Sequence, residues 1–545
     1  MTSQIPQWFA QAKVGMFYHF GLYTLLGGNE NQVRQTEGKD SYRNLLGEFN
    51  PTRFNADEWV DCAVSMGARY IVPTAKHAEG FCLWDSKLTE IKSTNTPCGR
   101  DIIGELAAAC AKKGVKFCFY FNLETWLNDG NDIWNKQGMS YPEFFEAQLT
   151  ELLTGYGPVG LVWFDHVHPE IPPERMRQII ATIKRLQPDC LVNNRGVSFA
   201  DPFLGDFITP ERMIPDSTSA NQQFIECCDS MGSKSWGFHS QEVFWSTSEL
   251  AKRVSLCRSK GYNYLLNIGP ASDGAILEEC LIRARGLGEW IENNRLSVEG
   301  GRCALVSVDP NLHDSPLGVA TLAGNTLYLH LHQWPVADEF LVKAAGTPIR
   351  AALNGLSLKV SSEEKGIRVG GLPADAPAGT APWIVAIEFE SVPVALAAAP
   401  KKIVEIVAGE SLFLSPLDAE LNSANGVVIP AINRFANGNI SVGSLHRAGD
   451  TLTWRALVPV EGTFEVYANL GAIKPQADAG FELSSGPSVI RGRTWETAHY
   501  SEPVRKSIGR LHLAQGENLI VLRVTDAPKE AFSDVHGLTL IPVAK

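Results

Sequence analysis

The chain has 545 residues, of which 44% are hydrophobic, and its mean hydropathy is −0.07, so it can bury large cores in water. This length favours two to four domains, and no apolar run reaches the ~18 residues that a membrane-spanning helix needs. The formal net charge of −12 argues against nucleic acid or an anionic membrane as the main partner.

Residues 1–300 alternate between apolar runs and amphipathic stretches. In chain order, the predicted strands are KVGMFYHFG, YIVPTAK, KFCFYFN, LVWFD, CLVNNR, GDFITP, KSWGFHS and YNYLLNIGP. The predicted helices include FNADEWVDCAVSMG, DIIGELAAACAKKG, YPEFFEAQLTELLTGYG, PERMRQIIATIKRLQP and TSELAKRVSLCRSKG. Continuous apolar strands that alternate with helices indicate a parallel sheet under helices, and about eight of them favour an α/β fold of the (β/α)8-like barrel type. A doubly wound sheet is the alternative, but no glycine-rich phosphate loop follows the first strand.

The pattern changes after residue 300. Residues 301–400 carry short alternating strands such as TLYLHLHQWP, which predict a small β domain. Residues 401–545 show turn signals roughly every ten residues, which is typical of a β-sandwich. This part resembles galactose-binding-type carbohydrate-binding modules in its strand rhythm. Its aromatic residues Trp454, Trp495 and Tyr500 are therefore candidates either for stacking on sugars or for core packing.

The chain has 11 cysteines, an odd number, and they form no CxxC pair. We expect most of them to be reduced core residues, which fits a reducing compartment. The N-terminal segment shows no basic-then-apolar signal pattern, so we expect a cytoplasmic protein, although a removed leader would change that expectation.

Polar residues follow nearly every predicted strand of residues 1–300. They are His19, Lys76, His77, Tyr120, Asn122, Asp165, Arg195, Asp206, Glu211, Trp236, His239 and Asn267. In a parallel barrel the carboxyl ends of the strands share one face, where active sites form. One polar residue at a strand end means little, but this concentration indicates an active site.

The composition of this set favours glycoside hydrolysis, which uses two carboxylates in different environments. Asp165 directly follows LVWF, so it should be rigidly held, partly desolvated and kept ionised by a nearby cation. It is our candidate nucleophile. The alternative is a metal site, because His166 and His168 would lie on one side of an extended chain, opposite Asp165. The first strand lacks a matching His-x-His, so we expect no metal.

Seven segments in order resemble the α-L-fucosidases of glycoside hydrolase family 29, over roughly residues 7–300. They are WFAQAKVGMFYHFGLYT, YIVPTAKHAEGFCLWDS, GYGPVGLVWFDH, LVNNR, ECCDSMGSKSWGF, GYNYLLNIGPASDGAI and GEWIENNRLSVEG. The resemblance implies an exo-acting, retaining enzyme that releases terminal α-L-fucose from an oligosaccharide or glycoconjugate, without metal or cofactor. The nucleophile would be Asp165, which becomes covalently fucosylated.

The resemblance also implies the roles of other residues. The acid/base is expected at Asp206, with Glu211 second and Glu226 third. Substrate contacts are expected at His19, Glu30, His77, Trp84, Tyr120, His166, Arg195, Glu226 and Trp236.

The sequence departs from this family at the sugar contacts. Ala78 and Glu79 stand where the family has a second histidine and an aspartate, and His166 stands at a family glycine. Glu30, in GGNENQVRQ, would replace the glutamate of an EWY segment. Three alternatives therefore stay open: an α-L-galactosidase-like enzyme, a non-catalytic carbohydrate-binding protein and a metal-dependent hydrolase. The sequence also leaves open the linkage cleaved and the oligomeric state, a homo-oligomer included.

Overall fold

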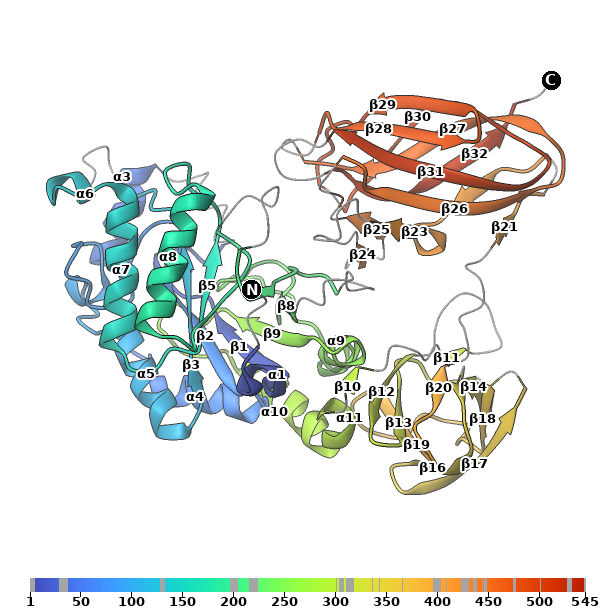
Figure 1. The fold of residues 1–545 in the computed structure, drawn as a ribbon. Coiled ribbons are helices and arrows are strands. Elements are labelled where there is room, and N and C mark those ends of the chain that lie inside the picture. The colour runs from blue at the N-terminus through green and yellow to red at the C-terminus, as the bar shows by residue number, and fades with distance from the viewer. Residues whose placement is uncertain are drawn as a thin grey trace. The chain divides into compact units, whose positions relative to one another are not determined.

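The computed structural model describes two compact units, one of which lies within residues 1–397, while the other consists mainly of residues 398–545 (Figure 1). The residues that it describes exclude 1–4, 29–37, 128–132, 197–203, 215–223, 300, 303–307, 310–317, 336, 343, 365, 396–402, 408, 423–430, 435–438, 444, 446–447, 474–476, 500, 527–531 and 544–545.

The first unit begins with a barrel of parallel strands. Its strands are β1 (Val14–Tyr18), β2 (Tyr70–Lys76), β3 (Lys116–Phe117), β4 (Phe119–Asn122), β5 (Leu161–Asp165), β6 (Leu191–Val192), β7 (Phe207–Ile208), β8 (Phe224–Ser230) and β9 (Asn263–Ile268). Their order is β6-β5-β4-β2-β1-β9-β8-β7, with β3 beside β2. A single parallel bridge between Asn193 and Phe207 joins the two edges, β6 and β7. The predicted (β/α)8-like barrel is confirmed.

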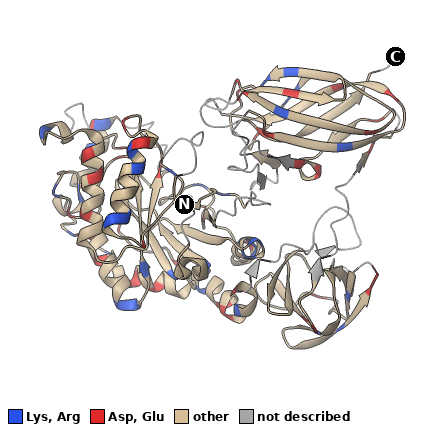
Figure 2. Ribbon diagram, viewed as in Figure 1, with Lys and Arg blue, Asp and Glu red and all other residues tan. Residues whose placement is uncertain are grey.

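The outer face of this sheet is covered by helices such as α4 (Ala56–Ser65), α5 (Ile102–Lys113), α7 (Tyr141–Gly155) and α8 (Pro173–Leu186) (Figure 1). The other described helices of this unit are α1 (Gln7–Ala12), α3 (Lys39–Asn44), α6 (Ile133–Lys136), α9 (Thr247–Lys260), α10 (Glu278–Asn293) and α11 (Arg295–Glu299). Short 3-10 turns are η1 (Leu22–Leu26), η2 (Leu45–Gly47) and η3 (Ser93–Asn95). Acidic and basic residues are interspersed on helices such as α7 and α8, while the barrel strands are mostly uncharged (Figure 2). Among the described helices, none is both long and apolar enough to cross a membrane.

The helix ends show why the sequence folds in this way. Asp101 caps α5 by accepting a hydrogen bond from the backbone N–H of Gly104, and Gly114 ends the helix in the left-handed conformation. Ser140 and Glu143 form a reciprocal capping box at the start of α7. These local signals stop each helix where the chain must turn back into the next buried strand.

One predicted strand is wrong. Residues 234–240, KSWGFHS, form a loop, and the strand of this part of the barrel is β8, with the sequence FIECCDS. Six of its seven residues are buried, so it has the apolar surroundings of a barrel strand although it contains Glu226 and Asp229. Gly232 and Gly237 flank the start of the loop, and glycine weakens a strand. The loop still brings Trp236 to the carboxyl ends of the strands.

A mostly antiparallel β domain follows in the same unit. Its strands are β10 (Gly301–Arg302), β11 (Val308–Asp309), β12 (Gly318–Ala323), β13 (Thr326–Leu331), β14 (Glu339–Val342), β15 (Ala344–Ala345), β16 (Pro348–Leu353), β17 (Leu356–Glu363), β18 (Gly366–Gly370), β19 (Trp383–Phe389) and β20 (Val394–Ala395). The main sheet has the order β10-β12-β11-β14-β18-β17-β16-β19-β13 and curls back on itself, because β12 also pairs with β13. Its interior is apolar.

The second unit is a β-sandwich. Its strands are β21 (Ile403–Glu405), β22 (Leu412–Leu414), β23 (Glu420–Asn422), β24 (Ala431–Arg434), β25 (Ile440–Gly443), β26 (Thr451–Val458), β27 (Gly462–Gly471), β28 (Gly480–Ser485), β29 (Ser488–Arg493), β30 (Val504–Leu513), β31 (Gly516–Asp526) and β32 (Asp534–Pro542), with a 3-10 turn η4 (Pro416–Asp418). They form two sheets with one apolar core. Trp454 lies in that core and Trp495 packs against it, so Trp454 is not a surface for sugar stacking. Tyr500 lies outside the described residues.

Each described sheet lies within one of the predicted parts 1–300, 301–400 and 401–545, and the first strand of the middle part, β10, begins at residue 301. We keep this three-part division as a proposal for the domain boundaries.

Candidate active site

A cavity opens at the carboxyl ends of the barrel strands, as expected for this fold. The space within it, including the part that is open to solvent, is about 510 Å³. It is lined by Phe17, His19, His77, Tyr120, Trp163, Asp165, His166, Arg195, Glu211 and Trp236. Eight of these ten are among the residues singled out from the sequence.

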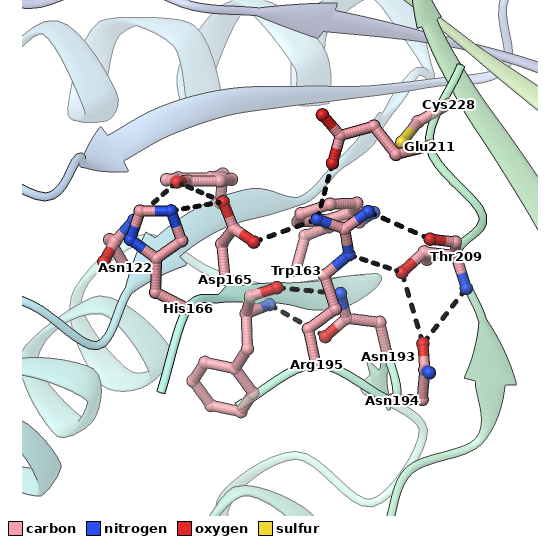
Figure 3. A network of polar contacts seen from close by, with 12 residues as sticks. Asn122, Trp163, Asp165, His166, Asn193, Asn194, Arg195, Thr209, Glu211 and Cys228 are labelled. Atoms are coloured by element: carbon pink, nitrogen blue, oxygen red, sulfur yellow. Dashed lines mark hydrogen bonds and ion pairs between the residues drawn. The ribbon is translucent and has the colours of Figure 1, made fainter. Parts of the chain in front are cut away.

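Asp165 is the last residue of β5 and is held from two sides. Its Oδ1 accepts a hydrogen bond from Nη1 of Arg195 at 3.0 Å, and its Oδ2 accepts one from the hydroxyl of Tyr120 at 2.9 Å. The Asn122 side-chain amide donates in turn to the Tyr120 oxygen at 2.7 Å. Figure 3 shows Asp165 within this polar network. These two hydrogen bonds hold the carboxylate in one orientation.

The surroundings of Asp165 keep it ionised. Burial alone would raise its pKa, but the positive charge of Arg195, and next that of the His166 imidazole, outweigh burial. Hydrogen bonds from Arg195 and Tyr120 act in the same direction, and together they lower the pKa of Asp165 to about 2. The charge that a nucleophile needs is thus present at any ordinary pH.

Glu211 shares the guanidinium of Arg195 with Asp165. The same Nη1 atom donates to Oε2 of Glu211 at 2.9 Å, and the two carboxylates lie on either side of it (Figure 3). The two carboxylate oxygens therefore cannot lie farther apart than the two contacts combined, about 6 Å. Their exposure differs, because the Glu211 side chain is 41% exposed and that of Asp165 only 17%. The site thus holds one buried and one solvent-facing carboxylate.

Aromatic and imidazole rings form the walls of the cavity. The rings of His77 and Tyr120 stack almost in parallel, with centroids 5.4 Å apart. The ring of His19 lies 5.2 Å from that of Trp236, and its Nδ1 hydrogen-bonds to the side chain of Asn267 at 2.8 Å. Flat apolar faces with polar edges suit a sugar, which presents C–H groups on one side and hydroxyls around its rim.

His166 lies beside the nucleophile in an unusual backbone conformation. Its φ is +58°, in the left-handed region that favours glycine. Its Nε2 is 3.8 Å from Oδ2 of Asp165, and its Nδ1 is 3.5 Å from Oε2 of Glu124. The extended-chain expectation, in which Asp165 and His166 face opposite sides, is therefore wrong at this position, because the strand has already ended.

The structure does not bring Asp206 or Trp84 into the cavity. Oδ2 of Asp206 accepts hydrogen bonds from Nζ of Lys184 in α8 at 2.7 Å and from the backbone N–H of Val192 at 2.8 Å. Trp84 is 1% exposed, and its Nε1 donates to Glu151 of α7 at 3.0 Å. Asp206 thus links β6, β7 and α8, and Trp84 anchors a loop against the helix layer.

Glu226 lies inside the barrel, below the cavity, and is not among its lining residues. It is fully buried; its Oε2 accepts a hydrogen bond from the hydroxyl of Tyr70, and its Oε1 accepts one from Nε1 of Trp163 at 3.1 Å. Among the acid/base candidates, Glu211 is the one that lines the cavity, and we keep it as the proposed acid/base. Glu30 lies outside the described residues.

Two cavity residues, Phe17 and Trp163, were missed from the sequence. Phe17 lies two residues before His19, which directly follows β1, and Trp163 lies two residues before Asp165 on β5. Side chains two apart on a strand share a face, so this spacing could have found them. Arg195 also bonds Thr209, two residues before Glu211, through both the hydroxyl and the carbonyl oxygen.

His168 lies apart from the carboxylate pair. Its ring packs against Tyr141 of α7 with centroids 4.1 Å apart, and its Nδ1 accepts the backbone N–H of Glu170 at 3.3 Å. The described residues contain no group of three or more His, Cys, Asp or Glu side chains that could hold a metal ion. The carboxylate of Asp165 already pairs with the guanidinium of Arg195, and a positive charge at that distance does not fit a site for a metal cation.

Comparisons with known proteins agree with this arrangement. The sequence profile of the family described as alpha-L-fucosidase matches residues 1–295. Tissue alpha-L-fucosidase of Mus musculus is 28% identical over 387 residues, which cover 65% of this chain and 84% of that protein.

Two solved structures share the fold. Alpha-L-fucosidase isoenzyme 1 from Paenibacillus thiaminolyticus has a TM-score of 0.62 and 27% identity, covering 71% of this chain and 98% of that one. A Bacteroides thetaiotaomicron alpha-L-fucosidase, described as a trapped covalent intermediate in complex with 2-fluoro-fucosyl fluoride, has a TM-score of 0.63 and 25% identity, covering 71% and 96%.

Proposed function

The chain belongs to the α-L-fucosidase family, and on that premise we propose that it releases terminal α-L-fucose from glycans by a retaining, double-displacement mechanism. Asp165 is the proposed nucleophile and Glu211 the proposed acid/base. The observation that supports this assignment is that Asp165 and Glu211 accept hydrogen bonds from the same guanidinium nitrogen, so that the two accepting oxygens lie no more than about 6 Å apart. Retaining glycosidases place their carboxyl groups about 5–5.5 Å apart, whereas inverting enzymes need about 6.5–9.5 Å for a water molecule.

In the first step an oxygen of Asp165 bonds to the anomeric carbon while the bond to the leaving oxygen breaks. Glu211, in its protonated form, gives its proton to that oxygen. In the second step Glu211 takes a proton from water, the water oxygen bonds to the anomeric carbon, and Asp165 is released. The exposure of Glu211 fits this role, because both the leaving group and the water must reach it.

The walls of the cavity support recognition of a small, exo-positioned sugar. His19, His77 and Tyr120 offer polar edges, while Phe17 and Trp236 offer faces for the apolar side of a 6-deoxysugar. Ala78 is buried and does not line the cavity, so its missing imidazole leaves the pair of carboxylates intact. A complete catalytic pair favours an enzyme over a binding protein on the same barrel.

The test is turnover of 4-nitrophenyl α-L-fucoside, with the corresponding α-L-galactoside as the alternative substrate. We expect Asp165→Gly to lose activity and to give β-L-fucosyl azide when azide is added. Glu211→Ala should instead give α-L-fucosyl azide, because azide then attacks the covalent intermediate. Asp206→Asn is the matched control and should give no azide product. Release of the β-anomer by the wild type, or no turnover of either glycoside, would refute the proposal.

A further inference from the structure

A buried carboxyl group lies directly under the floor of the cavity. Glu226 of β8 has no solvent exposure, and its two oxygens accept hydrogen bonds from Tyr70 of β2 and from the indole N–H of Trp163 of β5. Burial of an acidic group with only neutral donors is unfavourable unless those hydrogen bonds are kept. The position is therefore not explained by packing alone.

Trp163 connects this carboxyl group to the reacting groups. Its ring stacks on Tyr120 with centroids 5.7 Å apart and an interplanar angle of 20°. The guanidinium carbon of Arg195 lies 4.6 Å from the centroid of the same ring. Tyr120 and Arg195 are the two side chains that hydrogen-bond Asp165. A shift of the indole would therefore move both groups that hold the nucleophile.

We propose that Glu226 is a positioning residue, which fixes the Trp163 indole and thereby the Arg195–Asp165–Tyr120 arrangement. The inference rests on the proposed function, since it assigns a support to the same site. A carboxylate that accepts the indole N–H also draws positive charge toward the nitrogen edge, which leaves the ring face more negative toward the guanidinium. Glu226 would thus act on both the position of Arg195 and the strength of its contact with the ring.

The ionisation of Glu226 gives this role a pH signature. Burial raises its pKa to about 7, although the hydrogen bonds from Tyr70 and Trp163 act in the opposite direction. The other titratable groups with which it interacts are the thiols of Cys118 and Cys228, whose pKa values burial raises well above the ordinary range, as it does for Tyr70. These neighbours stay neutral near pH 7, so among these four groups only Glu226 changes its charge in that range.

Protonation would make Glu226 neutral, so the hydrogen bond that it accepts from the indole N–H of Trp163 would lose its charge assistance and weaken. We therefore expect kcat on 4-nitrophenyl α-L-fucoside to fall several-fold as the pH drops through about 7. The KM should change little, because Glu226 does not line the cavity.

The experiment compares Glu226→Gln, which keeps the shape and one acceptor, with Glu226→Leu, which removes both acceptors. We expect kcat to fall about ten-fold in the first and about a hundred-fold in the second, at nearly constant KM, and the step near pH 7 to vanish in both. Tyr70→Phe is the matched control: it removes one hydrogen bond to Glu226 but leaves Trp163 in contact, so its kcat should fall less. Near-UV circular dichroism should show a weakened tryptophan signal in the leucine variant.

A folded Glu226→Gln variant with the kcat and the pH profile of the wild type would overturn the inference. If Glu226→Leu does not fold, Glu226→Gln alone provides the test. Binding of a cationic imino analogue of L-fucose, measured by calorimetry, provides a readout without turnover. It should weaken several-fold in Glu226→Gln, and unchanged binding would count against the inference. An inactive wild type would refute the proposed function, whereas an active wild type with an unaffected glutamine variant would refute only the role of Glu226.

Discussion

Replacing Arg195 with methionine should change the protonation of the nucleophile more than it changes the shape of the site. Methionine keeps an apolar side chain over the Trp163 ring. It removes the guanidinium, whose Nη1 lies 3.0 Å from Oδ1 of Asp165 and 2.9 Å from Oε2 of Glu211. What remains is a buried carboxylate whose desolvation is no longer offset by this cation. We therefore expect the pKa of Asp165 to rise.

The size of the effect follows from the structure. The pKa of Asp165 is lowered from 3.8 to about 2 although burial acts in the opposite direction. That difference corresponds to about 2.5 kcal/mol at roughly 1.4 kcal/mol per pKa unit. Without Arg195, burial should bring the pKa above 3.8, while His166 and Tyr120 limit the rise. Loss of a preorganised charge in a catalytic site typically lowers kcat by about 10²–10³-fold.

The assay is kcat/KM on 4-nitrophenyl α-L-fucoside between pH 3.5 and 7, expressed as the ratio of variant to wild type. The ratio should fall as the pH decreases through the raised pKa of Asp165, because only the ionised carboxylate attacks. Arg212→Met is the control. The Arg212 guanidinium lies 4.8 Å from the Trp236 ring, and its side chain donates a hydrogen bond to the carbonyl of Ser233 rather than to a carboxylate of the site, so its ratio should not vary with pH. A pH-independent ratio for Arg195→Met would refute the assignment of Arg195 as the charge that keeps Asp165 ionised.

Three further predictions concern stability. His166→Gly should raise the free energy of unfolding by up to about 1 kcal/mol in urea titrations, because glycine adopts the left-handed φ of +58° without strain; a decrease would mean that the side-chain contacts of His166 outweigh that strain. Trp84→Phe should lower the free energy of unfolding by about 1.5–3 kcal/mol, because the hydrogen bond from the Trp84 indole to Glu151 is lost. The KM should stay unchanged, and an altered KM would restore Trp84 as a sugar contact. Burial lowers the pKa of His330 to about 3 and of His332 to about 4, so the unfolded chain binds more protons below pH 6.5. Stability should therefore fall by up to about 1.4 kcal/mol per pH unit and per histidine as the pH drops from 6.5 toward 4, and His332→Gln should reduce this slope.

The parts of the fold and site that could be predicted are those with a local signal. The buried run before Asp165 predicted both the strand and the place of the carboxylate, and the alternation of apolar runs with helices predicted the barrel. Strand β8 was missed because its apolar pattern is interrupted by Glu226 and Asp229, whose partners come from other strands and from α9.

The choice between Asp206 and Glu211 could not be made from the sequence. The two residues are five positions apart around β7, which is only two residues long, so neither periodicity nor spacing shows which one faces the cavity. Their partners in the fold differ, and our proposal of Glu211 rests on that difference: Lys184 from α8 holds Asp206 at 2.7 Å, and Arg195, 16 residues before Glu211, holds Glu211. Such distant pairings are a property of the folded barrel and leave no pattern in the local sequence.

The junction between β6 and β7 has a consequence for how the barrel opens. Among the described residues, one parallel backbone bridge joins these strands. Asp206 also bonds the backbone of Val192, and Arg195 bonds the carbonyl and hydroxyl oxygens of Thr209, across the same gap. A junction with little backbone pairing therefore also carries the guanidinium that holds the carboxylates. A ligand that engages Arg195 should protect the amides on both sides of this junction from hydrogen exchange, and sugar binding would be coupled to local unfolding at this one place.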